Sequence, residues 1–371
     1  MSNKIVGLVV KIVERCNLNC SYCYMYQHAD QSYRRRPNFM TEEIFSNLAT
    51  RIEEYCDRHP GHSLEMSFHG GEPMLIDPKK ADRFAAIVSE RLKGKVSLGM
   101  QSNATMVTDE WIEVLKRHRI MVGVSIDGPP EYHNLVRIDH AGRGSYDQTV
   151  KGLLKLQEAG VLSGVLTVIN PGHSGLSIYK HMRSLGMKKM NYLLPDATYD
   201  SKQVFYNGFG PTPVADYLIP IFDEWFAEDD PEVQIRFFEE IIRSMLGGDT
   251  HSEAIGNSPE NYLVIDTDGS IQANDALKVC EEGISESGLN VLQHGFDDLH
   301  LGLPLTHRLV SEGIPLSSKC QVCPERDVCG GGAIPHRFAK ANGFDNPSIW
   351  CEDLLKLITH VRSQVQYRMA A

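Results

Sequence analysis

Three cysteines near the start of the chain have a spacing that suits an iron–sulfur cluster. Cys16, Cys20 and Cys23 form a CxxxCxxC pattern directly after a strand-like segment. A structural zinc ion almost always takes four protein ligands, whereas a [4Fe-4S] cluster held by three thiolates leaves one iron open to a substrate or cofactor. Tyr22 stands beside the last cysteine, where it can cover a bound group. The pattern therefore favours a reactive cluster, with a zinc site or disulfides as the alternative.

A glycine-rich segment follows the second strand-like segment. Residues 68–73 read FHGGEP. Gly70 and Gly71 let the backbone approach a ligand without a Cβ in the way, and Glu72 adds an acceptor for an ammonium group. Alone, such a segment is more often a tight turn. One strand after the CxxxCxxC pattern, it indicates part of a binding site.

Further cysteines gather near the C-terminus. They are Cys320, Cys323, Cys329 and Cys351. Four thiolates can close a second cluster completely, and zinc is the alternative from the ligand count alone. Of the other two, Cys56 is expected to be a buried or partly buried free cysteine, and Cys280 a free thiol or a stray ligand.

Six strand-like runs alternate with helical patterns in the first half. The strand-like runs are 5–13, 64–68, 96–101, 121–126, 164–169 and 189–194. The helical patterns are 40–54, with Thr41 as N-cap, 78–92, 109–117, 146–159 and 175–185. Such alternation predicts a parallel sheet with right-handed crossovers, as an open doubly wound sheet or an incomplete barrel. In both, sites lie at the C-terminal ends of the strands, where the motifs of the first half fall.

The second half changes character. Residues 217–247 read as amphipathic helix, most simply a bridge between domains. A hairpin-like run over 262–271, with its turn at Asp268-Gly269, opens a small domain that contains the later cysteines. The predicted division is 1–216, 217–260 and 261–371.

Composition limits the function classes. The chain has 371 residues, 42% hydrophobic and 23% charged, which is typical of a soluble protein with one large and one small domain. A net charge of −11 without a dense basic tract argues against nucleic acid, and the one basic cluster, 34–36, is expected to be a solvated loop. No apolar stretch suits a membrane span or an export signal, so a cytoplasmic location is expected. Nine cysteines in such a chain are better read as metal ligands than as disulfides.

The cysteine trio and the GGEP segment together resemble the radical S-adenosylmethionine (SAM) superfamily. There the trio binds the cluster and the Gly-Gly-Glu segment receives the amino group of SAM. The resemblance implies a partial (β/α)6 TIM-like barrel followed by a small iron–sulfur domain. Similar peptide-modifying members place Ser125 and Arg137 near the ribose and carboxylate of SAM, and Asn103 ends the third strand among polar groups. The expected cofactor-binding residues are Tyr22, Gly70, Gly71, Glu72, Asn103, Ser125 and Arg137.

The C-terminal cysteines resemble the SPASM domain of radical SAM peptide maturases. The similarity rests on 323–332, 335–337 and 346–351, and it implies that the four cysteines bind an auxiliary [4Fe-4S] cluster. SPASM domains often carry a second auxiliary cluster, but two of its ligand positions read Asn274 and Ala333 here. The expectation is therefore one auxiliary cluster and two [4Fe-4S] clusters in all.

Asp275 is the candidate catalytic base. In related maturases an Asp in this place faces the active site and is proposed to take a proton from the substrate. The alternative is a turn residue that hydrogen-bonds its own backbone.

The resemblance also implies a reaction. SAM is split into methionine and a 5′-deoxyadenosyl radical, which abstracts hydrogen from a precursor peptide, with an electron donor such as flavodoxin or ferredoxin. Segments 275–278, 288–291 and 343–348 are most similar to the cyclophane-forming group, which joins an aromatic ring carbon to a β-carbon. The chain starts at the first barrel strand, so a leader peptide is expected to bind the barrel, the bridge helices or a separate protein.

Two alternatives to cyclophane formation stay open. The first is another peptide oxidation, such as formylglycine generation on a sulfatase, thioether formation or epimerisation. The loss of one auxiliary cluster disfavours the sulfatase-maturing reaction. The second is a non-catalytic iron–sulfur or zinc sensor protein.

Overall fold

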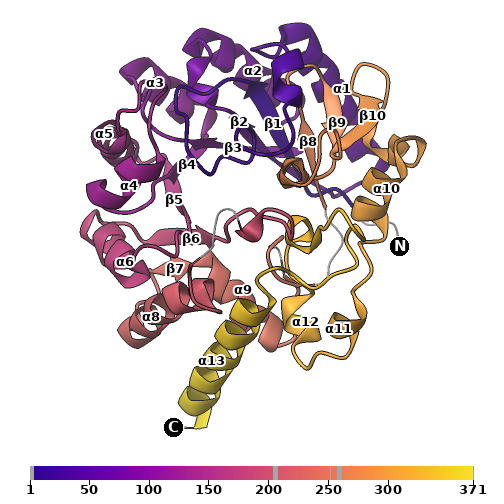
Figure 1. The fold of residues 1–371 in the computed structure, drawn as a ribbon. Helices are drawn as coiled ribbons and strands as arrows, with labels where there is room; N and C mark the ends of the chain where they lie inside the picture. Colours follow the sequence, from indigo (N-terminus) through magenta and orange to yellow (C-terminus); the bar gives the residue numbers. More distant parts are fainter. Residues whose placement is uncertain (1–3, 204–207, 251, 257–260, 371) are drawn as a thin grey trace. The chain divides into compact units, whose positions relative to one another are not determined.

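The computed structural model describes residues 4–203, 208–250, 252–256 and 261–370, and these residues form two compact units (Figure 1). Each unit combines segments that are distant in sequence. The first draws on residues up to 126, on 134–163 and on 261–313. The second draws on 127–133, on 164–256 and on 314–370.

A mixed sheet forms the core of the first unit. Its strand order is β10-β9-β8-β1-β2-β3-β4. The parallel strands are β1 (Gly7–Val13), β2 (Leu64–Gly70), β3 (Val96–Ser102), β4 (Met121–Ser125) and β8 (Tyr262–Ile265). The strand β9 (Ser270–Gln272) pairs antiparallel with β8, and β10 (Glu286–Asn290) pairs antiparallel with β9. Figure 1 shows β8 beside β1, although the two strands come from opposite ends of the sequence.

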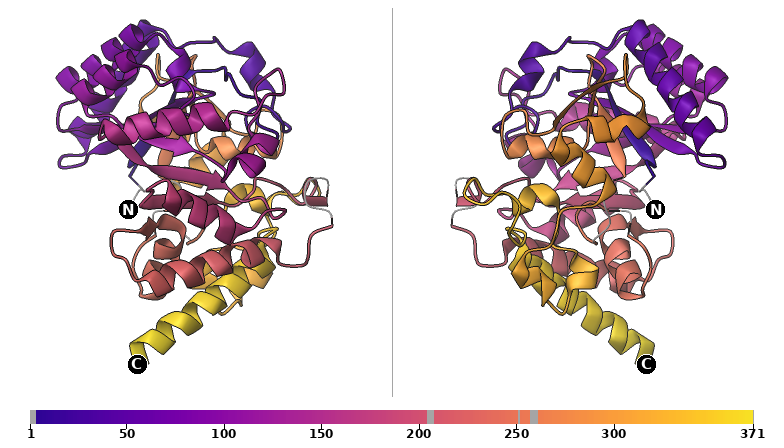
Figure 2. Two further views of the ribbon diagram at one scale, coloured as in Figure 1. Left: turned by 90° about the vertical axis from the view of Figure 1, so that its left-hand side faces the viewer. Right: turned by 90° about the vertical axis from the view of Figure 1, so that its right-hand side faces the viewer.

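Helices connect the parallel strands of this unit. They are α1 (Glu42–Arg58), α2 (Pro78–Arg91) and α3 (Asp109–His118), and they lie side by side (Figure 2). Phe45 of α1 stacks on Phe84 of α2 with ring centroids 4.3 Å apart, and it also contacts Phe68 of β2. These buried rings hold the helices against the sheet, because apolar area removed from water is the main favourable contribution to folding. The chain continues through α4 (Pro130–Val136) and α5 (Tyr146–Glu158).

The second unit has a small parallel sheet and a helical layer. Its strands follow the order β5 (Leu162–Val168), β6 (Lys189–Leu193) and β7 (Gln234–Ile235). Its longer helices are α6 (Gly175–Ser184), α8 (Pro213–Glu228), α9 (Arg236–Met245) and α13 (Cys351–Ala370). Asp353, in the first turn of α13, accepts hydrogen bonds from the backbone N–H groups of Val214 and Ala215, at 2.7 and 3.0 Å. The carboxylate caps the start of α8 and so fixes the beginning of α13, where Cys351 lies.

Short elements complete both units. The first contains η1 (Ser32–Arg35), η2 (Pro73–Leu75), η3 (Asp275–Val279), η4 (Phe296–Leu301) and α10 (Pro304–Ser311). The second contains α11 (Ser318–Gln321), α12 (Arg326–Cys329) and η5 (Ile334–Arg337).

The strands and helices predicted for the first half are confirmed to within a few residues. The predicted stretch 217–247 is two helices, α8 and α9, because Asp229 takes a left-handed conformation and a short strand intervenes. The hairpin with its turn at Asp268-Gly269 is confirmed as β8 and β9, and β8 in addition pairs with β1. The predicted domain boundaries at 216 and 260 stay a prediction, and 260 lies outside the described residues.

Two further expectations concern burial and membranes. Cys56 lies in α1 and is buried, as predicted. In the described part of the chain, no helix combines the length and apolar character that crossing a bilayer requires. A cytoplasmic location stays a prediction.

Replacing Thr41 by Ala should lower the free energy of unfolding by about 1 kcal/mol. The hydroxyl of Thr41 accepts a hydrogen bond from the backbone N–H of Ile44, 3.2 Å away, and thereby caps α1. Urea denaturation followed by circular dichroism measures the change. Thr41→Ser keeps the acceptor and is the control, so equal stability of the Ala and Ser variants would contradict the capping role.

Candidate active site

The three N-terminal cysteines lie together on the loop that leaves β1. Their thiols are close enough for the charges of Cys20 and Cys23 to act on Cys16. Burial, and then the neighbouring Cys20, raise the pKa of Cys23 to about 12, and burial likewise raises the pKa of Cys16. Thiols that resist ionisation alone become thiolates when a cationic metal centre binds them. The donor set therefore fits an iron–sulfur cluster.

The loop is held in place by a neighbouring segment of the same unit. The backbone N–H groups of Asn19 and Ser21 donate to the carbonyls of Ile138 and Val136, at 2.7 and 3.0 Å. This pairing brings Arg137 to the cysteines. Its Nη1 lies 4.0 Å from the Sγ of Cys20, and its guanidinium carbon is 5.5 Å from the ring centre of Tyr22. Two residues expected to bind SAM thus lie beside the cluster loop.

Gly70 and Gly71 are required by contacts within the protein. Gly70 has a φ of +135°, and a Cβ there would lie 1.8 Å from the carbonyl oxygen of Val13. A Cβ on Gly71 would lie 2.3 Å from the carbonyl oxygen of Arg15. The backbone N–H groups of Gly71 and Glu72 donate to these same carbonyls, each at 3.0 Å. The two glycines therefore let the end of β2 pack directly on the start of the cysteine loop.

Glu72 connects the ends of two strands. It is buried, and its Oε1 accepts hydrogen bonds from the N–H of Met74 and the hydroxyl of Ser102, at 2.9 and 2.8 Å. Its Oε2 accepts from the N–H of Asn103 at 2.7 Å. Burial raises the pKa of this carboxyl, while the three donors oppose that shift. The side chain predicted to receive an ammonium group thus also holds the glycine segment to the end of β3.

Asn103 and Ser125 follow on the next strands. The amide nitrogen of Asn103 donates to the Oδ1 of Asn17 at 2.9 Å and lies 3.8 Å from the Sγ of Cys16. Ser125, at the end of β4, accepts a hydrogen bond from Gln101 at 2.9 Å. Asn103 therefore contacts the cysteine loop directly, whereas Ser125 lies two strands away from β2.

Asp275 is held by a buried lysine. Its Oδ2 lies 3.0 Å from the Nζ of Lys11 and accepts a hydrogen bond from the hydroxyl of Tyr24 at 2.8 Å. Although burial opposes ionisation, the charges of Lys11 and Lys278 keep the pKa of Asp275 well below its usual range. The turn-residue alternative is wrong for Asp275, because Asn274 makes that bond, accepting from the N–H of Ala276 at 2.8 Å.

Lys11 is a residue that the sequence analysis missed. It is fully buried in β1, and its Nζ also lies 3.2 Å from the Oδ1 of Asp266. A single lysine within the apolar run of a central strand was the available signal, since such a charge needs a buried partner. Because the pKa of Asp275 is depressed, this pairing contributes stability above the unfolded pKa of about 4 and loses it as pH falls.

His69 and Arg36 are two further residues of this cluster. His69 pairs in register with Lys11, and its Nδ1 is buried without a hydrogen-bond partner. The expectation of a solvated loop at 34–36 is wrong for Arg36, which is buried with its Nε 3.1 Å from the Oδ2 of Asp266. Asp266 is itself fully buried, and a buried carboxylate needs cationic partners. Lys11 and Arg36 are those partners.

The C-terminal cysteines gather in the second unit. Cys320 lies on α11, Cys323 follows it, Cys329 ends α12 and Cys351 begins α13. Burial raises the pKa of Cys329 to about 12, and the charges of the other three thiols add to that shift. All four thiols are therefore close to one another. Cys280 is buried in the first unit.

Across the described ranges, no three His, Cys, Asp or Glu side chains are grouped as ligands of one ion. A [4Fe-4S] cluster does not require such a group, because each thiolate binds a different iron.

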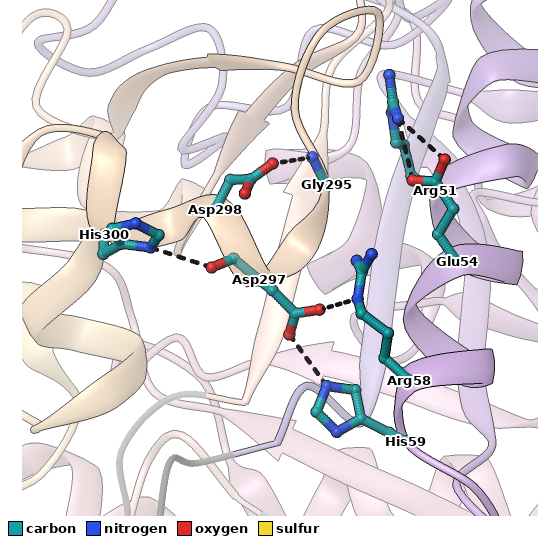
Figure 3. A pocket seen from close by; sticks show the side chains of 8 residues that line it. All are labelled: Arg51, Glu54, Arg58, His59, Gly295, Asp297, Asp298 and His300. Carbon is teal, nitrogen blue, oxygen red and sulfur yellow. Dashed lines mark hydrogen bonds and ion pairs between the residues drawn. The ribbon is translucent and has the colours of Figure 1, made fainter.

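A surface pocket of about 680 Å³ lies between α1 and η4 (Figure 3). Its lining residues are Arg51, Glu54, Arg58, His59, Gly295, Asp297, Asp298 and His300. Figure 3 shows Arg58 and His59 directed at Asp297, at 2.6 and 3.0 Å. None of the predicted site residues lines this pocket. The charged side chains that line it form ion pairs with one another.

Comparison with known proteins identifies the chemistry. Residues 10–185 match the Radical SAM superfamily. The chain is an enzyme with SAM and [4Fe-4S] iron as cofactors, and residues 10–185 are its radical SAM segment. The sensor-protein alternative is therefore wrong.

Several curated proteins are similar over nearly the whole chain. The cysteine-type anaerobic sulfatase-maturating enzyme of Clostridium perfringens is 22% identical over 91% of this chain and 90% of its own length. The serine-type anaerobic sulfatase-maturating enzyme of Bacteroides thetaiotaomicron is 21% identical over 95% of this chain and 88% of its own length.

Solved structures share the fold. Native anSMEcpe with bound AdoMet superposes with a TM-score of 0.84 at 20% identity, over 98% of both chains. SuiB of Streptococcus suis bound to its precursor peptide SuiA has a TM-score of 0.66 at 14% identity, over 94% of this chain and 76% of SuiB. The chain thus has the predicted α/β fold, with a parallel sheet core and a C-terminal extension.

Gly70→Ala should cost more than about 2 kcal/mol of stability and abolish SAM binding, because the backbone of Val13 would have to move. Gly61→Ala is the control, since Gly61 also has a positive φ, of +77°, but nothing lies within 4 Å of its Cβ position. That control should lose only about 1 kcal/mol. Thermal unfolding and anaerobic calorimetry with SAM measure both effects, and equal behaviour of the two variants would contradict the close packing.

Proposed function

We propose that this radical SAM enzyme oxidises a side chain of a peptide or protein substrate. The observation that carries the proposal is the pairing of two separate thiol groups, one of three and one of four cysteines, in one chain. The named activity of the sulfatase-maturating relatives and the precursor peptide bound to SuiB support a peptide substrate. A ferredoxin or flavodoxin stays the expected electron donor.

The N-terminal thiols are the proposed ligands of the SAM-binding cluster. Cys16, Cys20 and Cys23 would hold three iron atoms and leave the fourth for SAM. When bound, the cluster and SAM supply the 5′-deoxyadenosyl radical that removes a hydrogen atom from the substrate. The chain's own residues position SAM around them. These are Tyr22, Gly70, Gly71, Glu72, Asn103, Ser125 and Arg137.

Arg137 has a clear electrostatic role in this proposal. A guanidinium 4.0 Å from Cys20 offsets the negative charge of three thiolates, and its remaining donors suit the carboxylate of SAM. Glu72 and Asn103 meet at the end of β3, 3.8 Å from the Sγ of Cys16 on the Asn103 side, and Glu72 retains acceptor capacity for an ammonium group.

The C-terminal thiols are the proposed ligands of one auxiliary cluster. Cys320, Cys323, Cys329 and Cys351 would occupy every iron, so this cluster has no open position for SAM. Asn274 and Ala333 stand where a second auxiliary cluster would need thiols, and Asn274 caps η3 instead. A cluster with no open iron would accept an electron without binding SAM, which suits a two-electron oxidation of the substrate.

Asp275 is the proposed proton acceptor. Lys11 keeps its carboxylate ionised, which is the form that accepts a proton. The hydroxyl of Tyr24 lies 2.8 Å from the same oxygen and orients it. A base held by a permanent cation is weak, however, so the substrate group must be acidic when it is deprotonated, as a radical-bearing side chain is.

The bond formed is the finer part of the proposal. A cyclophane cross-link is supported by segments 275–278, 288–291 and 343–348 and by the absent thiols at 274 and 333. Formylglycine generation on a cysteine or serine is the second candidate, because sulfatase-maturating enzymes are similar over 91–95% of this chain.

Two synthetic peptides distinguish these reactions. One carries a cysteine in a sulfatase-type sequence, and the other carries aromatic residues next to side chains with β-hydrogens. Anaerobic incubation with SAM and dithionite should yield 5′-deoxyadenosine and a modified peptide. An aldehyde that reacts with hydroxylamine identifies formylglycine, whereas loss of two hydrogen atoms with resistance to fragmentation identifies a cross-link. Conversion of neither peptide would contradict both assignments.

Replacing Cys16, Cys20 and Cys23 together by Ala should remove half of the bound iron and all formation of 5′-deoxyadenosine. Replacing Cys351 by Ala should instead remove the auxiliary cluster and leave SAM cleavage in place. Iron and sulfide analysis with product chromatography measures both. Cys56→Ala is the control, since Cys56 is buried in α1 and should leave the iron content unchanged. Zinc in the N-terminal site would overturn the proposal.

Asp275→Asn should leave SAM cleavage intact and slow peptide product formation by about 10²-fold, because an amide cannot accept the proton. The ratio of peptide product to 5′-deoxyadenosine, measured with the converted peptide, reports the change. Asp297→Asn, in the surface pocket, is the control for the same loss of charge. An unchanged ratio for Asp275→Asn would show that another group takes the proton.

A further inference from the structure

Arg337 is a buried cation in the second unit, at the end of η5. Only 1% of its surface is exposed. Its guanidinium donates to backbone carbonyls only: to Asn346 at 3.1 Å, Ile314 at 3.3 Å, Phe344 at 3.0 Å, and also to Pro315. Its nitrogens are therefore well supplied with acceptors, but all of these acceptors are neutral.

Two other buried cations, Lys11 and Arg36, have a buried carboxylate as partner. Lys11 lies 3.2 Å from Asp266, and Arg36 lies 3.1 Å from the same side chain. For Arg337, in contrast, the described residues provide no ion pair within 4.0 Å. The carboxylate that acts on it most, Asp345, is exposed and thus screened by water. A guanidinium removed from water without a counter-charge is costly.

The thiols of the second unit would supply the missing negative charge as thiolate ligands of a cluster. Arg337 lies beside a cysteine-bearing segment, because its Nη1 is 3.9 Å from the Cβ position of Gly331, two residues after Cys329. The charge of Cys320 also acts on Arg337. Cys320 belongs to the group of four thiols that we propose as the auxiliary-cluster ligands. A [4Fe-4S] centre with four thiolates is an anion, and it gains one more negative charge on reduction.

We propose that Arg337 is the built-in counter-ion of the auxiliary cluster and raises its reduction potential. The inference rests on the proposed function, because it requires that cluster. A fixed cation stabilises the reduced, more negative state more than the oxidised state, so the cluster accepts an electron more readily. In the proposed reaction the auxiliary cluster would supply an acceptor for one electron of the substrate radical, and Asp275 would take the proton, so a higher potential would make the oxidation easier to complete.

The arrangement of donors shows why an arginine suits this position. Arg337 makes hydrogen bonds to two chain segments, at 314–315 and 344–346. These bonds fix the position of its charge, so little reorganisation of the guanidinium is needed when an electron arrives. A flexible surface cation would have neither property.

Redox titration followed by electron paramagnetic resonance tests the proposal. The background is the full chain with Cys16, Cys20 and Cys23 replaced by Ala, so that only the auxiliary cluster contributes. Arg337→Gln should shift the midpoint to a more negative value. At a fixed potential the ratio of reduced to oxidised cluster should fall about tenfold, which corresponds to about 59 mV for one electron.

Two further variants separate charge from structure. Arg337→Lys keeps the charge and should keep the midpoint close to that of the parent. Arg326→Gln removes an arginine between Cys323 and Cys329 whose side chain is 49% exposed and paired with Asp327, and it should leave the midpoint unchanged because water screens it.

The outcomes are distinct. A midpoint unaffected by Arg337→Gln, or lowered equally by Arg337→Lys, overturns the counter-ion role. Loading of iron into the Lys variant but not into the Gln variant supports it, since the charge is then needed to bind the cluster at all. If the parent background itself contains no auxiliary cluster by iron analysis, the proposed function fails at that step, and this is visible before Arg337 is changed.

Discussion

A buried positive charge organises the first unit. Lys11 stands in the middle strand of the sheet, and its ammonium group pairs with the carboxylates of Asp266 and Asp275. Asp266 follows β8, and Asp275 begins η3, so both come from the far end of the sequence. Because a buried lysine without these partners would be strongly destabilising, the C-terminal segment must return to the edge of β1. The interaction that holds the fold together also holds the candidate base.

Close backbone packing is the second constraint on the site. The cysteine loop begins where β1 ends, and the carbonyls of Val13 and Arg15 receive N–H groups from the glycine segment that ends β2. Glu72 in turn connects the glycine segment to the end of β3, because it accepts a hydrogen bond from the N–H of Asn103. The ligand-bearing loop is thus connected to three neighbouring strands by hydrogen bonds of ordinary length. Chemistry that requires a fixed target atom depends on such rigid connections.

Local sequence patterns predicted much of this structure. Alternating and β-branched residues identified the strands of the first half, Thr41 marked the start of α1, and the cysteine spacings grouped the thiols as the structure does. The missed features depend on contacts between distant residues. Nothing near Lys11 or Arg36 in the sequence shows that Asp266 will lie beside both. For the same reason the pairing of β8 with β1 was not predicted, because the hairpin pattern says nothing about its other edge.

The pairing of β8 with β1 also bears on how the chain acquires its structure during synthesis. Gly7 pairs with Tyr262, so one edge of the first strand has no neighbour until most of the polypeptide has left the ribosome. Long-range pairing of this kind slows folding, and the open edge of β1 is prone to self-association until β8 pairs with it. Until Asp266 arrives, Lys11 must stay hydrated, which keeps that edge from closing on a wrong partner. The sheet around β1 is therefore completed only after the last third of the chain has emerged.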